Sequence, residues 1–161
     1  MQHAQAKFTF SSLVEFLTIG GLLLHALLLL LAWGLLPESI PVHFNPAGRA
    51  DAWGARTDLL LLFGLSVLFY AGLTWLGRYP QKFNYPWEIT EGNAAQQYRL
   101  ASSFVRVIKL ETVWLFAIIS VGMVGVSLGQ AGGLGYLFAP LVLVVTSLTI
   151  IGYFVAASRS A

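Results

Sequence analysis

The chain has 161 residues, of which 57% are hydrophobic and only 10% are charged, whereas a soluble domain carries about a quarter charged residues. This composition excludes an ordinary soluble domain and predicts an integral membrane protein that forms one compact bundle. The absence of cysteine excludes disulfides, thiolate metal sites and cysteine nucleophiles, and the formal net charge of +2 is too small to indicate nucleic-acid binding.

Four apolar stretches are each suited to crossing a hydrocarbon core of about 30 Å, which needs about 20 helical residues. They cover residues 13–36, 59–77, 112–129 and 134–157. The first stretch is too long for the hydrophobic region of a typical signal peptide, so we expect it to remain as a span. The predicted fold class is therefore all-α, an integral membrane four-helix bundle that forms a single membrane domain over residues 1–161.

The first span carries three polar residues within an arc of about 80° on its helical wheel: Glu15, Thr18 and His25. His25 lies near mid-span, where an ionisable residue is by default a functional candidate. The alternative is a neutral histidine that bonds a hydroxyl of another helix, for which the candidates are Ser66, Thr74, Ser120, Thr146 and Thr149. Glu15 lies near the inner boundary of the span, where a contact with Arg106 or Lys109 would neutralise its charge.

The connection of residues 37–58 contains a turn sequence. Residues 45–48, Asn-Pro-Ala-Gly, place Asn, Pro and Gly at the positions that a type I turn favours. We expect the chain to leave the first span, run extended as far as Phe44, turn back and enter the second helix through Thr57, which suits an N-cap. Phe44 and Trp53 suit the membrane interface, where aromatic rings are enriched.

The same connection holds polar side chains that a turn does not require. In a structural interpretation, Asp51 caps a short turn or pairs with Arg49 or Arg56, and such an exposed pair contributes less than about 1 kcal/mol. In a functional interpretation, four side chains form a ligand-binding surface: His43, Asn45, Asp51 and Trp53. Both interpretations fit the residue types.

A metal or catalytic site is a further alternative for this connection. His43 and Asp51 supply one imidazole and one carboxylate, with Glu38 as a third candidate ligand. Catalytic zinc sites generally use three protein ligands, and general acid–base chemistry by His43 with Asp51 as its orienting partner is chemically reasonable. Because no nucleophile motif or phosphate loop accompanies them, we predict neither catalytic residues, nor a metal, nor a cofactor.

The connection of residues 78–111 ends in an amphipathic helix that we expect to begin near Glu91. One side of its wheel is apolar, and the other carries Arg99, Ser102, Ser103, Arg106 and Lys109. The helix should lie on the membrane surface or lead directly into the third span. Three of its cations would suit anionic lipid headgroups, or would act as snorkelling anchors without a specific partner: Arg99, Arg106 and Lys109.

Basic residues set the predicted topology, because cytoplasmic loops are enriched in Lys and Arg. The connection 37–58 has two basic residues, the connection 78–111 has five, and the turn at residues 130–133 has none. We therefore expect cytoplasmic N- and C-termini, a cytoplasmic second connection and an outward-facing first connection in a multi-pass protein of the bacterial inner membrane. Gly132, Gly133 and Gly135 should form a tight turn between the last two spans.

Eight residues of the first connection form the pattern Pro-x-His-Phe-Asn-x-x-Gly-x-x-Asp-x-Trp-Gly: Pro41, His43, Phe44, Asn45, Gly48, Asp51, Trp53 and Gly54. This pattern resembles the loop signature of a bacterial membrane domain of unknown function that is shared with the SdpI toxin-immunity protein. Residues 83–101 also resemble a segment of small members of that domain family. The two stretches cover about a quarter of the chain.

The resemblance implies a non-enzymatic membrane protein of the immunity or signal-receptor type, in a small four-span form. It implies membrane lipids, a secreted peptide or a cytoplasmic regulator as partners, with the first connection as the recognition loop. Two other classes stay open on the residues alone. One is a membrane enzyme or metal site at the outer face that uses His43, Asp51 and Glu38, and the other is a transporter or accessory subunit with His25 inside the bundle.

Overall fold

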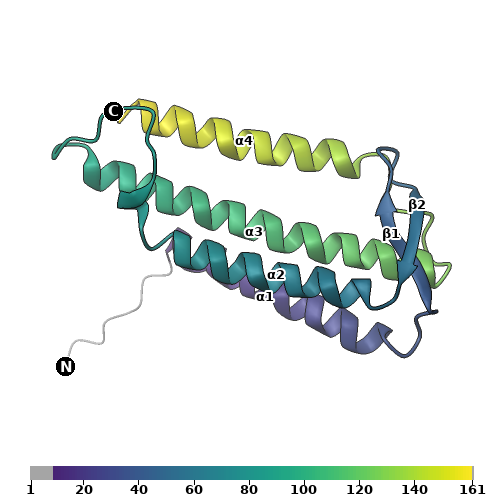
Figure 1. Ribbon diagram of the computed structural model, residues 1–161. Coiled ribbons are helices and arrows are strands. Elements are labelled where there is room, and N and C mark those ends of the chain that lie inside the picture. Colours follow the sequence, from purple (N-terminus) through teal and green to yellow (C-terminus); the bar gives the residue numbers. More distant parts are fainter. Residues whose placement is uncertain (1–8, 161) are drawn as a thin grey trace, which may run out of the picture.

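The computed structural model describes residues 9–160, and four long helices dominate it (Figure 1). They are α1 (Phe10–Ala32), α2 (Asp58–Leu76), α3 (Ala94–Ser127) and α4 (Phe138–Ser158). Each is long and apolar enough to cross a membrane, which confirms the all-α membrane bundle and makes the chain a multi-pass membrane protein. A 3₁₀ turn, η1 (Pro80–Lys82), and two short strands, β1 (Ser39–Phe44) and β2 (Ala50–Ala55), complete the structure.

The amphipathic segment and the third span form one continuous helix, α3, of 34 residues. A helix of this length measures about 51 Å, so it extends well beyond a hydrocarbon core of about 30 Å. Of the two arrangements anticipated for the amphipathic segment, the structure therefore has the one that leads directly into the span. α3 begins at Ala94 rather than near Glu91, because Thr90 and Asn93 first form a reciprocal pair of side-chain to backbone hydrogen bonds.

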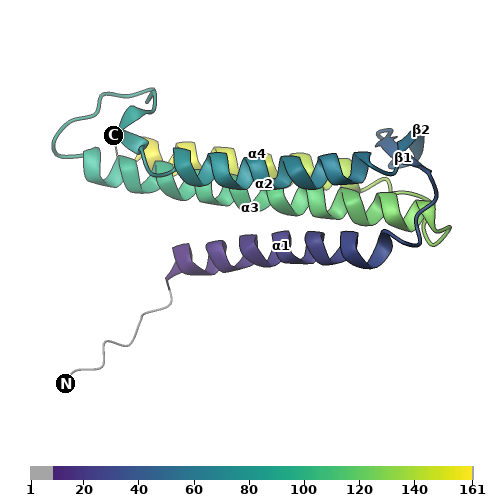
Figure 2. The same cartoon turned by 60° about the horizontal axis from the view of Figure 1, so that its bottom comes forward.

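α3 is the central helix of the bundle, and both views show it between α1 and α4 (Figures 1 and 2). α1 and α2 pack against α3 and against each other, whereas the helix contacts of α4 are mainly with α3. Gly21 permits the close approach of α1 to α3, because a Cβ there would lie 3.0 Å from Nε1 of Trp114. That same Nε1 donates to the Leu17 carbonyl at 3.1 Å, which fixes the two helices in register.

β1 and β2 form an antiparallel hairpin across one end of the bundle (Figure 1). Its base is buried, because Ile40 and Leu59 are fully inaccessible. Together they join a cluster formed by the ends of α1 and α3: Leu29, Ala32, Leu36, Met123 and Val124. Phe44 is half-buried and packs against this cluster, and its position at the membrane interface stays a prediction.

The tip of the hairpin docks on the loop between α3 and α4. The Gly48 carbonyl accepts a hydrogen bond from the Leu134 amide at 2.8 Å, and the Leu134 side chain lies over Gly122 of α3. Gly48 has φ +73°, and a Cβ there would lie 2.3 Å from the Gly135 carbonyl oxygen. A Cβ on Gly133 would in turn lie 2.0 Å from the Gly48 oxygen. The glycine-rich loop is therefore a seat for the hairpin as well as a turn.

Candidate functional site

The hairpin brings His43 and Asp51 together on its exposed surface. His43 Nδ1 lies 2.5 Å from Asp51 Oδ1, and their side chains are 65% and 41% exposed. The strand register explains the contact: Pro41 pairs with Trp53, His43 with Ala52 and Phe44 with Ala50. Val42 and Asp51 are therefore extra residues on opposite strands. Such bulges redirect side chains and are common beside functional sites.

The two arginines considered as partners of Asp51 do not form a salt bridge with it. Arg56 instead places its guanidinium 5.3 Å from the ring of Trp33 at the end of α1, and its amide donates to the Glu38 carbonyl at 2.9 Å. The base of the hairpin is thereby attached to the helix end, and the Asp51 carboxylate is left for His43. The sequence offers Arg49, Arg56 and His43 as candidate partners of Asp51 and does not distinguish among them. The two bulges bring Asp51 to His43, and bulges cannot be read from the sequence.

Asn45 shapes the turn, although it was also a candidate ligand residue. Its side-chain oxygen accepts hydrogen bonds from the amides of Ala47 at 3.0 Å and Arg49 at 3.1 Å, while the Gly48 amide donates to its backbone carbonyl. This is the local bonding by which Asn stabilises turns. The Asn45 oxygen is therefore already engaged, and we assign this residue a structural role.

Trp53 and Asp51 both occupy exposed positions of β2, although the bulge at Asp51 interrupts the regular pairing of the strand. Trp53 is 55% exposed, and the strand alternates between half-buried and exposed positions along its length. A polar pair and a large indole are thus both exposed on the hairpin at the end of the bundle. The carboxylate orients the imidazole through Nδ1, which leaves Nε2 as the ring nitrogen available to a ligand.

Glu38 does not complete a three-residue ligand set with His43 and Asp51. Within residues 9–160, no three His, Cys, Asp or Glu side chains are grouped so that they could hold a metal ion. A metal site at the outer face would need Glu38 as its third ligand. The structure therefore does not support this hypothesis.

A buried ionic network joins α1, α2 and α3 near the other end of the bundle. Lys109 is only 2% exposed, and its Nζ donates to Glu15 Oε2 at 2.7 Å and to Thr74 Oγ1 at 2.9 Å. The Tyr70 hydroxyl donates to the second Glu15 oxygen at 2.7 Å, and Nζ lies 4.6 Å from the Tyr70 ring. The predicted Glu15–Lys109 contact is confirmed, but Tyr70 was not anticipated.

The location of Lys109 corrects its predicted role. This side chain cannot lie among lipid headgroups with Arg99 and Arg106, because it is enclosed by three helices and neutralised by Glu15. The helical wheel grouped it with the other cations since it lies three residues after Arg106, at the edge of the polar side. α1 and α2 cover that edge, so the burial of Lys109 is evident only from the packing of the three helices.

His25 is buried in the middle of the bundle, with 1% of its surface exposed. Its Nε2 lies 2.7 Å from Ser120 Oγ on α3, and its ring contacts Phe63 of α2 edge-on with centroids 5.1 Å apart. Ser120 was one of the hydroxyl partners proposed from the sequence. Thr18 is also fully buried, and its hydroxyl donates to the Val14 carbonyl within α1.

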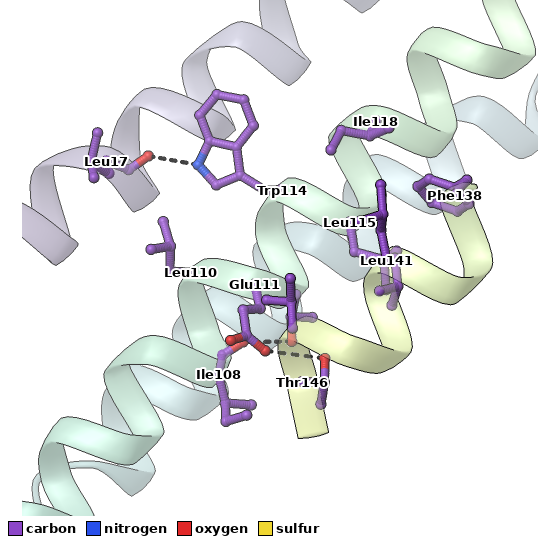
Figure 3. Close-up of a pocket in the computed structure, with 13 residues that line it drawn as sticks. Leu17, Ile108, Leu110, Glu111, Trp114, Leu115, Ile118, Phe138, Leu141 and Thr146 are labelled. Carbon is purple, nitrogen blue, oxygen red and sulfur yellow. Dashed lines mark hydrogen bonds between the residues drawn. The ribbon is translucent and has the colours of Figure 1, made fainter. Parts of the chain in front are cut away.

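An apolar groove of about 640 Å³ runs along α3 between α1 and α4 (Figure 3). Leu17 of α1, Trp114 and Ile118 of α3, and Phe138 and Leu141 of α4 are among the residues that line it. Its one carboxylate, on Glu111, is already engaged, because it accepts hydrogen bonds from two threonines of α4, Thr146 and Thr149. A second, smaller hollow lies near η1. His25 lines neither the groove nor this hollow. Neither cavity therefore provides the path to His25 that the transporter hypothesis requires.

Comparison with known proteins places the hairpin at the centre of the shared region. Residues 20–73 match the family model described as "Domain of unknown function (DUF1648)". The matched residues run from the middle of α1 through the hairpin to the end of α2. The His43–Asp51 pair therefore lies within them, whereas α3, α4 and the smaller hollow lie outside.

A relative from Archaeoglobus fulgidus, described as an uncharacterized protein, is 35% identical over 65 residues. That alignment covers 35% of this chain and 36% of the relative, so the two proteins share only about a third of their lengths. No solved structure matches the chain. From the middle of α1 to residue 73 in α2, the chain is thus similar to a domain whose function is unknown.

Proposed function

We propose that the protein is a non-enzymatic bacterial inner-membrane protein of the SdpI-like immunity or signal-receptor type. In this proposal the hairpin faces the outside of the cell and recognises a secreted peptide through His43, Asp51 and Trp53. The cytoplasmic side would carry the contact with lipids or with a regulator. The observation that carries the proposal is the exposed His43–Asp51 pair on a hairpin that is anchored at both its base and its tip.

The anchoring matters because recognition favours a preorganised surface. The hairpin base is held by Ile40 in the core, and its tip by the Gly48–Leu134 hydrogen bond. Neither attachment uses the imidazole of His43 or the carboxylate of Asp51, because these two groups are hydrogen-bonded to each other. An exposed pair of this kind contributes at most about 1 kcal/mol to stability. The fold therefore has little need of it, which supports a role in binding.

Substituting His43 with Ala or Asp51 with Asn should abolish recognition while leaving the protein folded. The affinity for the peptide should fall at least about tenfold, equivalent to 1.4 kcal/mol of binding. Cells of a strain sensitive to an Sdp-type secreted peptide should accordingly survive less well with either variant than with the wild type. Membrane accumulation should be unchanged because the pair is exposed. Arg49→Gln, which changes a neighbouring exposed cation, is the matched control and should retain protection.

Two results would overturn this assignment. If both variants protect as well as Arg49→Gln does, the pair is not part of the recognition surface. If both fail to accumulate in the membrane whereas Arg49→Gln accumulates normally, the pair is a folding element, and recognition must use other residues. Thermal unfolding of the purified variants in detergent separates this second result from a simple loss of binding.

The proposed orientation is testable because the chain contains no cysteine. Ala47→Cys places a single thiol at the exposed hairpin tip, and Lys82→Cys places one in η1 at the other end of the bundle. A membrane-impermeant maleimide should label intact cells that carry the first variant. It should label the second only after the membrane is permeabilised. The reverse pattern would place the hairpin in the cytoplasm and remove the proposed contact with a secreted peptide.

A further inference from the structure

A second hollow lies at the end of the bundle opposite the hairpin, beside η1. It has a volume of about 330 Å³ and is lined by Pro80, Tyr98, Arg99, Ser102, Ser103 and Arg106. In contrast to the apolar groove, its lining includes two arginines and three hydroxyl-bearing residues, two serines and a tyrosine. The residues belong to two elements, since Pro80 begins η1 and the others lie in the first part of α3.

Four of the lining residues form one continuous helical face. Arg99, Ser102, Ser103 and Arg106 occupy positions i, i+3, i+4 and i+7 of α3, and such residues lie above one another on the same side of a helix. The two arginines are therefore about two turns apart, roughly 10 Å along the axis, with both serines between them. Donors above and below a central pair of hydroxyls are an arrangement suited to one tetrahedral anion.

Neighbouring elements hold this face in place. The Ser102 hydroxyl donates to the Gly77 carbonyl at the end of α2 at 3.1 Å. On the opposite wall, the Tyr85 hydroxyl donates to the Pro80 carbonyl at 3.0 Å. Burial raises the pKa of Tyr85 to about 12, so its phenol stays protonated and retains this bond at physiological pH. These two bonds tie the α3 wall of the hollow to the end of α2 and the η1 wall to Tyr85.

Neither arginine of the hollow forms an ion pair within residues 9–160, although the Glu15 carboxylate lies near enough to Arg106 for the two charges to interact. Between residues 9 and 160 the structure contains two ion pairs, His43–Asp51 and Lys109–Glu15, and neither involves Arg99 or Arg106. Arg99 donates to the neutral side chain of Gln96 at 2.6 Å. Two guanidinium groups without an ion-pair partner at one hollow create a positive potential, which a bound anion would relieve.

The depth of the hollow matches that of lipid phosphates. Ser102 is bonded to Gly77, the residue at which α2 ends, and α2 has 19 residues, close to the length that crosses the hydrocarbon core. The hollow therefore lies where a spanning helix leaves the apolar layer and where phosphate groups are concentrated. Lys109, three residues deeper along α3 than Arg106, is already committed to Glu15.

We propose that this hollow is a phosphate-binding site, in which Arg99 and Arg106 clamp the anion and Ser103 donates to it. The guanidinium fork matches the oxygens of a phosphate group. The anion would be the phosphate of a membrane lipid or a free phosphate, which offer the same group to these donors. The site is independent of the recognition surface on the hairpin, and either assignment can fail without the other.

The test uses the full chain in uncharged detergent micelles, with the thermal unfolding midpoint as the readout. A ligand that binds only the folded state raises this midpoint, by an amount that grows with the ratio of its concentration to its Kd. Two pairs of additions are compared: short-chain phosphatidylglycerol against short-chain diacylglycerol, and inorganic phosphate against chloride at equal ionic strength. We expect phosphatidylglycerol to stabilise the wild type. Stabilisation by inorganic phosphate alone to the same extent would identify the source as free phosphate.

Variants separate a defined site from general charge. Arg99→Gln/Arg106→Gln should weaken the apparent affinity at least tenfold. Arg78→Gln/Lys82→Gln removes two exposed cations from the same end of the bundle but outside the lining of the hollow. It should leave the affinity within about twofold, since neither side chain contacts the anion in this proposal and exposed charges are partly screened by salt. Ser103→Leu, which fills the hollow without changing charge, should also abolish stabilisation and remains informative if the arginine double variant does not fold.

Three outcomes would overturn the proposal. The first is equal weakening by the two double variants, which would mean that the effect is general electrostatic attraction. The second is full stabilisation of Ser103→Leu, which would mean that the hollow is not occupied. The third has two parts: diacylglycerol stabilises the wild type as strongly as phosphatidylglycerol does, and inorganic phosphate has no effect. This outcome would mean that the protein binds acyl chains rather than phosphate.

Discussion

Replacing Glu15 with Leu should lower the unfolding free energy by about 3 kcal/mol, because breaking a buried ion pair leaves the partner's charge without compensation. The Lys109 ammonium, only 2% exposed, would retain the Thr74 hydroxyl and the Tyr70 ring but no countercharge. For a domain of this size, such a loss corresponds to roughly 6–12 °C in the unfolding midpoint. Thermal unfolding in detergent, followed by size-exclusion chromatography of the soluble fraction, measures it.

The double variant Glu15→Leu/Lys109→Met distinguishes an unpaired charge from lost packing. Replacing both members of a buried pair with apolar residues of similar volume is often neutral, so the double variant should recover most of the lost stability. Arg78→Met, which removes an exposed cation outside the network, serves as the control and should change the midpoint little. If Glu15→Leu behaves like Arg78→Met, the network contributes no net stability and its role lies elsewhere.

Substituting Gly48 or Gly133 with Ala should release the hairpin from its seat. A Cβ at Gly48 would lie 2.3 Å from the Gly135 oxygen, and one at Gly133 would lie 2.0 Å from the Gly48 oxygen. Both glycines also have positive φ values, +73° and +147°, which L-residues adopt only at a cost. A two-stranded hairpin is marginally stable by itself, so tryptic cleavage after Arg49 should accelerate at least tenfold, which mass spectrometry would detect.

Gly132→Ala is the matched control for this prediction. It lies in the same loop, but a Cβ there would meet nothing within 4 Å and its φ is not in the left-handed region. Its cleavage rate should equal that of the wild type. Equal cleavage in Gly48→Ala and Gly132→Ala would contradict the docking of the tip. Faster cleavage in all three variants would mean that the loop depends on glycine generally rather than on close contact with the hairpin.

The four helices were predictable because hydropathy and length alone define them, and the hairpin turn because Asn45 and the following Pro-Ala-Gly favour it. The continuity of α3 was harder to predict. Its sequence changes from amphipathic to apolar near Glu111, which resembles a boundary between two elements. No proline interrupts residues 94–127, however, and a helix that lacks a breaker can cross from the interface into the membrane without a break.

Side-chain partners across the bundle were only partly predictable. Lys109 was one of two partners considered for Glu15, and Ser120 was one of five hydroxyl residues considered for His25. The participation of Tyr70 was not predicted, because rotation of α2 about its own axis cannot be read from a helix that is apolar on nearly every side. The seat formed by Gly133 and Gly135 was also hidden, since a glycine-rich loop has the same composition whether or not another backbone approaches it.

The bond between Gly48 and Leu134 has a consequence for the order in which the molecule is assembled. The hairpin lies in the first third of the chain, while its seat follows the third membrane helix. During synthesis, which adds about 5–20 residues per second, the hairpin must therefore wait several seconds for its partner to appear. Before that, α1, the hairpin and α2 exist without the surface that closes over them. Completion of this fold thus depends on the late arrival of α3 and the loop that follows it.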